Sequence, residues 1–430
     1  MLLPDEFIRH TAPLFGTVLW EAFVRAMDEE PPVSIRLNPR KPKSDELRAK
    51  VSQQGERVPW CADGYYLHSR PVFTADPLLH AGAYYVQEAS SMFLDTVLRQ
   101  VLPLSGKEQP QVLDLCAAPG GKSTLAVSVL PAGSALTCNE PVRKRASVLV
   151  ENITKWGYPN VEVTNSYAAD FATERRMFNI IIADVPCSGE GMFRKDEGAA
   201  HLWSTRNIER CARLQRQIVS DIWPCLEPGG IMIYSTCTLN TRENEENVRY
   251  IAAELGADIV PVTTQQQWGI TGSLLKGFDA PVYRFIPGLT RGEGLFMAVL
   301  RKKDSGRTRL ESAPTRTRQE SAPTAWRRAL HVIYDSREAK EPPSPSLALS
   351  TDFDRAKYPT IDLDRDEALS YLRHEALHLP EGTPLGYVAV SYDGRPLGFV
   401  KNIGSRANNL YPAQWRIRST HIHDTHEAIS

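Results

Sequence analysis

The sequence predicts an α/β protein whose central sheet is mostly parallel. Apolar runs of strand length alternate with segments of helical periodicity between residues 111 and 302. One run, the three isoleucines at 180–182, has no polar face, which is typical of a strand buried on both sides. An acid and a thiol follow this run, and open α/β sheets bind their ligands at the carboxyl ends of such strands.

The segment from 111 to 302 contains seven predicted strands. Strands are expected over 111–115, 135–140, 161–165, 180–184, 230–235, 283–286 and 294–301, and helices over 122–129, 142–156, 208–226 and 243–255. Repeated strand and helix units predict parallel strands with helices on both faces of the sheet. A turn with Pro and Gly joins the last two strands, so they are expected to form a hairpin that adds an antiparallel strand.

The segments that flank this core differ from it in composition. We expect a mixed α+β N-terminal module over 1–105, the α/β core over 106–303, a basic Pro/Ser/Thr linker over 304–349, a small β-rich module over 350–418 and a tail over 419–430. The N-terminal module begins with apolar residues at helical spacing, which predicts one or two amphipathic helices. In the C-terminal module, Asp393 and Gly394 stand between two apolar runs and predict a β-hairpin.

The overall composition limits the classes of protein that are possible. The 430 residues have a formal net charge of −1, so a nucleic-acid surface must be a local patch. Seven cysteines without a C-x-x-C pair argue against a disulfide framework or a zinc site, and no metal is expected. The chain starts without a signal-peptide pattern, and no stretch approaches the ~20 apolar residues of a membrane span. We expect a monomeric, cytoplasmic protein without a membrane anchor.

A glycine-rich turn joins the first strand of the core to its first helix. Its residues are Cys116, Ala117, Ala118, Pro119, Gly120, Gly121 and Lys122. The glycines let a ligand approach the helix N–H groups. The turn does not match a P-loop, which needs Gly where this chain has Cys116, and the dinucleotide fingerprint G-x-G-x-x-G is absent. Glu140 ends the second strand, where an acid can bond ribose hydroxyls, and Asp170 follows the third, where it could hold an amino group. This combination favours S-adenosylmethionine over a nicotinamide, although either acid could be an ordinary helix-start residue.

Two cysteines lie in tight polar turns directly after strands. Cys187 follows Asp184 at the end of the fourth strand, and Cys237 follows the fifth. One such cysteine is most often a small buried hydrophobe, but two at one sheet edge beside an acid indicate chemistry. Methylation of C5 of cytosine requires this set, because a thiolate that adds to C6 makes C5 nucleophilic and a second thiol assists elimination. Arg242 and the helix after it are expected to provide the positive setting that a thiolate needs.

These motifs together resemble those of the Sun/Nop family of RNA 5-methylcytosine methyltransferases. The resemblance is carried by residues 116–122, 184–191 (DVPCSGEG), 194–196, 235–238 (STCT) and 244–247, with 34–38 and 85–92 upstream and 408–412 downstream. The arrangement is similar to the bacterial ribosomal-RNA, RsmF-like branch over about 1–302 and 350–418. Val185 stands where the family more usually has alanine, which is a mild departure.

The resemblance implies a Rossmann-like methyltransferase core with a seven-stranded sheet, a PUA-like C-terminal RNA-binding module, S-adenosylmethionine as cofactor and 16S ribosomal RNA as substrate. It implies that Cys237 is the nucleophile and that Cys187 assists release of the product. The residues implied to hold the cofactor are the turn at 116–122 with Glu140, Arg145, Asp170 and Asp184. Asn165 is the alternative to Asp170, because the loop that contains Asp170 varies in length.

Local basic or polar stretches are candidates for contacts with RNA. Residues 34–43 hold four cations and no acid, and cations alternate with aromatic residues over 404–418. The candidate residues are Arg36, Arg40, Lys41, Lys195, Arg406, Asn408 and Asn409. An ordinary solvated surface is the alternative for each stretch, and Tyr84 and Tyr85 could stack on bases or lie in the core.

Three other functions stay open at this point. A transfer-RNA substrate fits the same chemistry. A DNA cytosine-5 methyltransferase would use a Pro-Cys nucleophile and a Glu-Asn-Val motif; residues 246–248 match that motif but lie inside a predicted helix, and Cys237 would have no role. A catalytically silent RNA-binding assembly factor would use the basic linker and the C-terminal module, but it would not need the glycine turn or the two cysteines.

Overall fold

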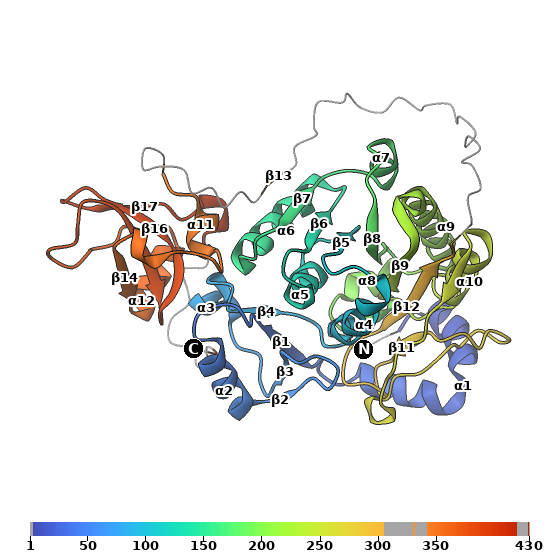
Figure 1. Cartoon of the computed structure of the whole chain (residues 1–430). Helices are drawn as coiled ribbons and strands as arrows, with labels where there is room; N and C mark the ends of the chain where they lie inside the picture. The colour runs from blue at the N-terminus through green and yellow to red at the C-terminus, as the bar shows by residue number, and fades with distance from the viewer. Residues whose placement is uncertain (1–2, 305–329, 332–341, 419–428, 430) are drawn as a thin grey trace.

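The computed structural model describes residues 3–304, 330–331, 342–418 and 429. Most of the predicted basic linker and of the predicted C-terminal tail therefore lies outside the described residues. Figure 1 shows the central sheet with a second sheet below it, built from the N-terminal segment, and a third to its left, built from the C-terminal segment. None of the described helices combines the length and apolar character that a membrane crossing requires.

The central sheet has the strand order β10-β12-β9-β8-β5-β6-β7-β13, and β11 pairs with β12. Its strands are β5 (Gln111–Asp114), β6 (Ala135–Asn139), β7 (Val161–Thr164), β8 (Phe178–Asp184), β9 (Leu226–Thr236), β10 (Ala257–Ile259), β11 (Tyr283–Phe285), β12 (Leu295–Lys302) and β13 (Leu330–His331). Strands β5 to β9 pair in parallel, whereas β10, β11, β12 and β13 are antiparallel to their neighbours.

The predicted parallel core and its terminal hairpin are confirmed, but the described sheet has nine strands rather than seven. The two additional strands, β10 and β13, have three and two residues and contain no apolar run that periodicity could detect. The strand order reverses at β5, because β6 and β7 extend the sheet in one direction and β8 and β9 in the other. This reversal is the place where open α/β sheets have their ligand crevice.

Alternate residues of β8 face opposite layers of helices, as expected for a strand without a polar face. Ile180 and Ile182 pack in one apolar core, and Ile181 packs in another on the other side of the sheet. The first core contains α4 (Leu94–Val101), α5 (Gly121–Val129) and α6 (Arg143–Trp156), and the second contains α7 (Ala168–Thr173), α9 (Thr205–Ile222) and α10 (Glu245–Glu254). Helix α9 begins three residues earlier than predicted because the Ser204 side chain accepts a hydrogen bond from Asn207 N and caps it.

The N-terminal segment contributes helices and a small antiparallel sheet with the order β2-β3-β1-β4. Its elements are α1 (Asp5–Met27), β1 (Val33–Leu37), α2 (Ser44–Gln54), β2 (Gly55–Arg57), β3 (Gly64–Leu67), α3 (Pro77–His80) and β4 (Tyr84–Val86). Helix α1 is interrupted at Gly16, whose φ of 68° lies in the left-handed region, so it consists of two helical segments. Its apolar stripe packs on the segment after β8: the ring of Phe7 lies 5.1 Å from that of Phe193 and 5.5 Å from that of Trp203.

Two cations predicted to contact RNA are instead structural, and this corrects the sequence analysis. Arg36 is 2% exposed, donates from Nε to Gln87 and from Nη2 to Thr124, and stacks over the Trp156 ring. Lys41 is 5% exposed, and its Nζ donates to the Leu349 carbonyl at 2.5 Å. Both cations join the N-terminal segment to other parts of the chain and have no face left for a phosphate.

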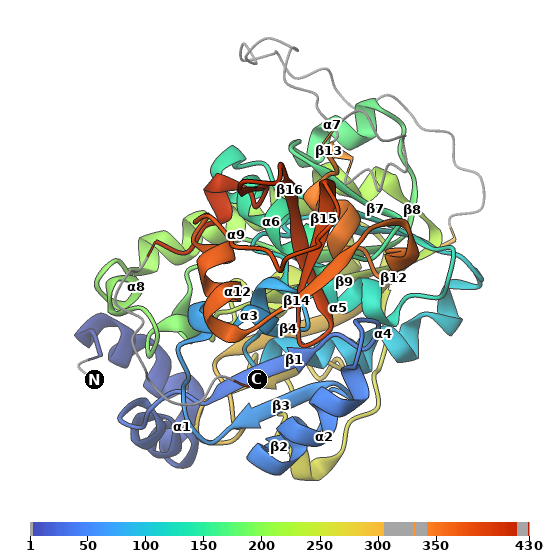
Figure 2. The same cartoon turned by 90° about the vertical axis from the view of Figure 1, so that its left-hand side faces the viewer.

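The C-terminal segment forms a four-stranded sheet with the order β14-β15-β16-β17. Its elements are α11 (Pro345–Leu349), β14 (Thr360–Leu363), α12 (Arg365–Leu372), β15 (Gly386–Tyr392), β16 (Arg395–Asn402) and β17 (Ala407–Asn409). The predicted hairpin is confirmed, because Asp393 and Gly394 form a two-residue turn with φ of 47° and 67° between β15 and β16. Figure 2 looks onto this segment, which contacts the N-terminal segment where the Tyr411 hydroxyl lies 3.3 Å from His80 Nδ1.

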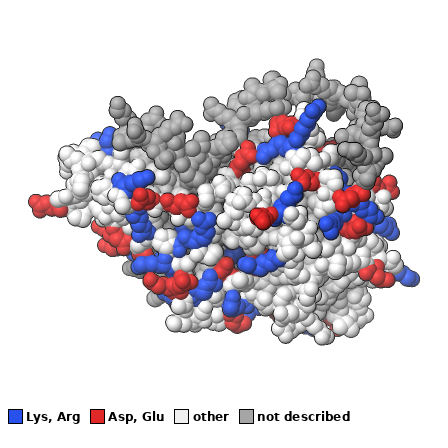
Figure 3. All heavy atoms as spheres, viewed as in Figure 1, with Lys and Arg blue, Asp and Glu red and all other residues white. Residues whose placement is uncertain are grey.

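On the face shown in Figure 3, basic and acidic side chains lie among one another, and neither sign dominates. This agrees with the net charge of −1 and means that attraction of a polyanion depends on local groups of cations.

Candidate active site

The glycine-rich turn lies between the end of β5 and the start of α5. Gly120 has a φ of 114°, which favours glycine, and a Cβ atom there would lie 3.2 Å from Leu149 Cδ1. Two side chains of α6 hold the turn, because Arg145 Nη2 donates to the Ala118 carbonyl and Asn152 Nδ2 donates to the Pro119 carbonyl, each at 2.8 Å. The turn is therefore fixed from outside while the first N–H groups of α5 point toward the edge of the sheet.

Glu140 lies directly after β6 and is 1% exposed. Its Oε1 accepts a hydrogen bond from Val142 N at 2.9 Å. Its Oε2 lies 3.1 Å from Arg145 Nη1 but accepts no hydrogen bond. A buried carboxylate oxygen without a donor is costly, so this atom fits a ligand that brings a hydroxyl group.

A second buried acid, Asp114, ends β5 and was not predicted as a site residue. Its Oδ2 accepts a hydrogen bond from Ser123 Oγ at 2.6 Å, whereas its Oδ1 has no partner. Burial raises the pKa of Asp114 to about 7, and the hydrogen bond from Ser123 only partly opposes this. The signal in the sequence is an acid inside an apolar strand, directly before the glycine-rich turn.

Asp170 has the helix-start role that the sequence analysis left open as the alternative to cofactor binding. It is the third residue of α7, and its Oδ2 accepts a hydrogen bond from the Tyr167 N–H in a capping box. The alternative residue, Asn165, directly follows β7, and its Nδ2 donates to the Glu140 carbonyl at 2.6 Å. Asn165 is therefore the one of the two that directly contacts Glu140.

The two cysteines predicted to carry the chemistry come together. Cys187 Sγ and Cys237 Sγ lie 3.2 Å apart, although the residues are 50 positions apart in the chain. Asp184 is beside them at the end of β8, where its Oδ1 accepts a hydrogen bond from Ser235 Oγ at 2.6 Å and its Oδ2 lies 2.9 Å from Lys122 Nζ. Lys122 thus connects the glycine-rich turn to the edge that carries the thiols.

The protonation states around the thiols differ. The pKa of Cys187 is raised well above its ordinary value, first by the hydrogen bond with Cys237 and then by burial. Burial alone would lower the pKa of Lys122, but the charges of Asp184 and Cys237 outweigh burial and raise it. Cys187 therefore carries a proton and Lys122 a positive charge.

Arg242, which was predicted to provide a positive setting for Cys237, is paired with two acids. Its guanidinium pairs with Glu209, at 2.8 Å from Nε, and with Glu246 of α10. Lys122, from a motif 115 positions away in the chain, lies on the same edge of the sheet through its ion pair with Asp184.

Two buried carboxylates, neither of them predicted, hold the two cysteine loops to each other. Glu190, from the loop of Cys187, accepts hydrogen bonds through Oε2 from Leu239 N at 2.7 Å and from Asn240 N at 2.8 Å. Glu243, from the loop of Cys237, accepts a hydrogen bond through Oε2 from Ser188 N at 3.0 Å. Asn240 Nδ2 lies between the two acids, 3.1 Å from Glu190 Oε1 and 2.9 Å from Glu243 Oε1.

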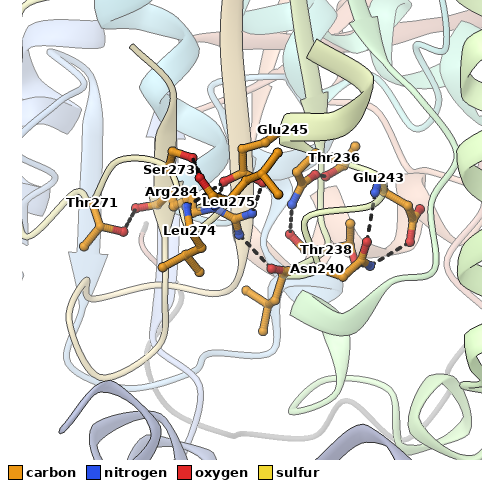
Figure 4. A network of polar contacts seen from close by, with 12 residues as sticks. Thr236, Thr238, Asn240, Glu243, Glu245, Thr271, Ser273, Leu274, Leu275 and Arg284 are labelled. Carbon is orange, nitrogen blue, oxygen red and sulfur yellow. Dashed lines mark hydrogen bonds and ion pairs between the residues drawn. The ribbon is translucent and has the colours of Figure 1, made fainter. Parts of the chain in front are cut away.

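A buried ion pair supports this network from the side of the terminal hairpin (Figure 4). Arg284 of β11 and Glu245, the first residue of α10, are 1% and 0% exposed and pair with each other. Arg284 Nη1 also donates to the Leu239 carbonyl at 2.7 Å, and Glu245 Oε1 accepts a hydrogen bond from Leu274 N at 2.9 Å. The segment after Cys237 is thereby fixed on both sides.

The remaining residues predicted to contact RNA belong to different parts of the structure. Arg40 pairs with Asp352 at 2.9 Å. Lys195 follows the Cys187 loop and is partly exposed. Arg406 and Asn408 are exposed at and beside β17, whereas Asn409 Nδ2 donates to the Tyr371 carbonyl. They do not form one cluster with the thiols.

Comparison with known proteins agrees with this geometry. Residues 101–301 match the model of the family described as 16S rRNA methyltransferase RsmB/F, residues 3–89 match the N-terminal domain of 16S rRNA methyltransferase RsmF, and residues 358–417 match the methyltransferase RsmF PUA domain. The chain belongs to the RsmB/F family.

Curated relatives of this RsmB/F chain carry the name ribosomal RNA small subunit methyltransferase F. The one from Cronobacter sakazakii is 32% identical over 321 residues, which are 70% of this chain and 64% of that protein. The one from Erwinia tasmaniensis is 27% identical over 412 residues, which are 83% of this chain and 84% of that protein. The chain thus spans about 64% of the length of the first of these relatives.

Solved structures share the RsmB/F fold. A methyltransferase homolog protein from Pyrococcus horikoshii is 25% identical, with a TM-score of 0.55, and the match covers 70% of this chain and all of that one. NSun6 from the same organism, with SFG, is 20% identical, with a TM-score of 0.58, and covers 70% of this chain and 98% of that one. The fold is therefore that of an S-adenosylmethionine-dependent methyltransferase.

Proposed function

We propose that this chain methylates C5 of a cytidine in small-subunit ribosomal RNA, through a temporary bond between Cys237 and C6 of the base. The pair of thiols carries the proposal, because their sulfur atoms lie 3.2 Å apart at the carboxyl ends of β8 and β9. One thiol would suffice for an ordinary nucleophile, whereas addition and elimination at the same ring give each of two thiols a task. The names of the curated relatives support ribosomal RNA as the substrate.

The cofactor S-adenosylmethionine supplies an electrophilic methyl group. We assign its binding to the turn at 116–122 and to Glu140, whose buried Oε2 has no donor and fits a ribose hydroxyl. Arg145 supports the turn through the Ala118 carbonyl. Asp170 is assigned to an amino group of the cofactor, with Asn165, which contacts Glu140, as the alternative.

Cys237 is the nucleophile of the proposed reaction. Its thiolate would add to C6, and the electrons of the C5–C6 double bond would shift to C5. C5 would then take the methyl group while the bond between that carbon and the sulfonium sulfur breaks, which leaves a neutral thioether. Asp184 bonds N3 and the amino group of the base, which favours this addition. Its carboxylate is oriented for that task by the hydrogen bond from Ser235 and by Lys122.

Elimination returns the enzyme to its starting state. C5 gives its proton to a base, the C5–C6 double bond forms again, and the electron pair of the C6–S bond returns to Cys237. Because the pKa of Cys187 is raised by the hydrogen bond with Cys237 and by burial, its thiol keeps a proton and can donate it in a hydrogen bond to the departing sulfur. Cys187 therefore assists release.

Two cysteine variants test these roles. Cys237→Ala is expected to abolish transfer of a labelled methyl group to RNA, and Cys187→Ala is expected to accumulate a covalent protein–RNA adduct that a denaturing gel detects. Cys225→Ala is the control, because Cys225 is 1% exposed and directly precedes β9, at the opposite edge of the sheet from the two thiols. Full turnover by Cys237→Ala would contradict the assignment.

The RNA itself is identified by bisulfite sequencing of total RNA from cells with and without the protein. A cytidine in 16S ribosomal RNA is expected to lose its protection in cells that lack the protein. If a cytidine in transfer RNA loses its protection instead, the substrate is transfer RNA and the proposed chemistry stands. If no cytidine loses its protection but small-subunit assembly is defective, the chain is a non-catalytic RNA-binding factor.

A further inference from the structure

A basic groove lies at the start of α9, outside the site described above. Its volume is about 590 Å³. It is lined by Leu202, Ser204, Arg206, Asn207, Arg210 and Arg213. Figure 2 shows α8 (Glu197–His201), the helix just before this segment, at the left-hand rim of the molecule above α1.

The three arginines of the groove present a concentrated positive charge. They are spaced by four and three residues on α9, so they share one helix face, and all three are exposed. In the described part of the chain none of them is within ion-pair distance of an acid; Arg210 Nη2 donates to Asn207 Oδ1 at 2.9 Å instead. Of the two acids on the same helix, Glu209 is engaged by Arg242 at 2.8 Å, and Asp221 lies about two turns beyond Arg213.

The position of the groove relates it to the thiols. Helix α9 leads from the Cys187 loop back to the start of β9, so its first turns lie at the same edge of the sheet as Cys187 and Cys237. Two hydrogen bonds tie the groove to the Cys187 loop: Trp203 Nε1 donates to Glu190 Oε1 at 2.8 Å, and Gln215 Nε2 donates to the Pro186 carbonyl at 3.0 Å.

We propose that this groove binds the phosphates of the RNA segment that flanks the target cytidine. The inference rests on the proposed function, because an RNA whose base reaches Cys237 must continue across this edge of the sheet. Guanidinium groups bind phosphate oxygens in a bidentate manner, and three of them along one helix face match a run of backbone phosphates. Leu202, which is 79% exposed, adds an apolar surface at the rim that a base can cover.

The test is the triple variant Arg206→Gln, Arg210→Gln, Arg213→Gln in the full-length protein. The probe is a single-stranded cytidine-containing RNA, and its dissociation constant is measured by fluorescence anisotropy from 50 to 300 mM salt. Each phosphate contact to single-stranded RNA contributes about 0.7 to the slope of log K against log salt, so loss of three contacts should reduce the slope by about 2. At about 150 mM salt we expect at least a tenfold weaker affinity and an equal fall in kcat/KM for RNA, with unchanged affinity for S-adenosylmethionine.

A matched control removes three charges at the opposite edge of the sheet. Lys107, Arg301 and Lys303 are exposed there, before β5 and at the end of the antiparallel strand β12. Their triple Gln variant is expected to keep both the salt slope and the affinity. Equal salt slopes for the wild type and the groove variant would overturn the proposal.

The experiment separates this proposal from the proposed function. RNA affinity is measured without methyl transfer. A smaller salt slope in the groove variant therefore supports RNA binding by the groove even if no methylation is found. Conversely, methylation by a groove variant whose RNA affinity and salt slope are unchanged would support the enzyme and overturn the groove.

Discussion

Replacement of Asn240 by aspartate should convert the link between the two cysteine loops into a repulsion. The side chain of Asn240 is fully buried, and its Nδ2 donates between two buried acids, 3.1 Å from Glu190 Oε1 and 2.9 Å from Glu243 Oε1. Asn240→Asp keeps the size of the side chain but replaces the shared donor with an acceptor. Three carboxyl groups would then lie together, and the amide group that now donates to both glutamates would be lost.

The expected cost follows from these distances. Two unit charges about 3 Å apart repel by roughly 5 kcal/mol at an effective dielectric constant of about 20. The protein can avoid part of this repulsion by keeping a proton on one carboxyl group, and an uncompensated buried charge typically costs about 3–5 kcal/mol. We therefore expect Asn240→Asp to lose roughly 3–5 kcal/mol of the free energy of unfolding at pH 8, within the range for a broken buried charge network.

The pH dependence identifies the cause. A carboxyl group whose pKa is higher in the folded than in the unfolded protein favours folding at low pH, and this contribution is lost as pH rises through the folded pKa. Burial already acts in this direction on Glu243, whose pKa is raised despite hydrogen bonds from Ser188 and Asn240. The deficit of Asn240→Asp relative to the wild type should thus be small at pH 5 and grow toward pH 8.

The assay is denaturant unfolding at pH 5, 6.5 and 8, with Asn240→Ala as the matched variant. The alanine variant also loses the donor but adds no charge, so its deficit should change less with pH. Methyl transfer by Asn240→Asp should fall with its stability, because the spacing of the two sulfur atoms depends on this link. Equal and pH-independent deficits in the two variants would refute the reasoning.

Three further predictions concern other groups in and around the site. Because burial raises the pKa of Asp114 to about 7, the free energy of unfolding should fall as pH rises from about 4 to 7, and Asp114→Asn should flatten that slope in denaturant titrations; an unchanged slope would contradict this. Arg284→Met leaves Glu245 buried without an ion-pair partner and should cost about 3–5 kcal/mol by calorimetry, part of which the double variant with Glu245→Leu should restore; a single variant as stable as the wild type would be the opposite result. Diamide should oxidise Cys187 and Cys237, 3.2 Å apart, to a disulfide with loss of two titratable thiols and of methyl transfer, both restored by dithiothreitol; transfer that persists after the two thiols are lost would rule this out.

The order of elements was largely predictable because burial leaves a direct trace in the sequence. The isoleucines at 180–182 have no polar face, and in the fold they do contact helices on both sides of the sheet. Once five parallel strands are expected, the residues after each strand must share one edge, which brings Cys187 and Cys237 together without any knowledge of contacts. Strands as short as β10 and β13 leave no such trace, since they owe their conformation to neighbours that are distant in sequence.

The charged residues were predicted less well, because a cation's sequence neighbours do not determine its acceptors. Arg36 lies in a basic stretch typical of a phosphate-binding surface, yet its donors are taken by Gln87 and Thr124 inside the fold. Arg242 is close to Cys237 in sequence but pairs with Glu209 of α9. Asp114 was overlooked because its role depends on its contacts in the fold. An acid within an apolar strand is exceptional in the sequence, but only the structure shows that Asp114 Oδ1 is buried without a hydrogen-bond partner.

The loops that carry the two thiols illustrate why polar contacts fix this site. Apolar packing is insensitive to small rotations, whereas a carboxylate that accepts from two successive backbone N–H groups defines both position and orientation. Glu190 acts in this way on residues 239 and 240, and Glu243 acts in the opposite direction on Ser188, so each cysteine loop supplies the acid that holds the other. Because each acid fixes residues of the opposite loop, the loss of either should disturb the two cysteines together and change the 3.2 Å spacing of their sulfur atoms.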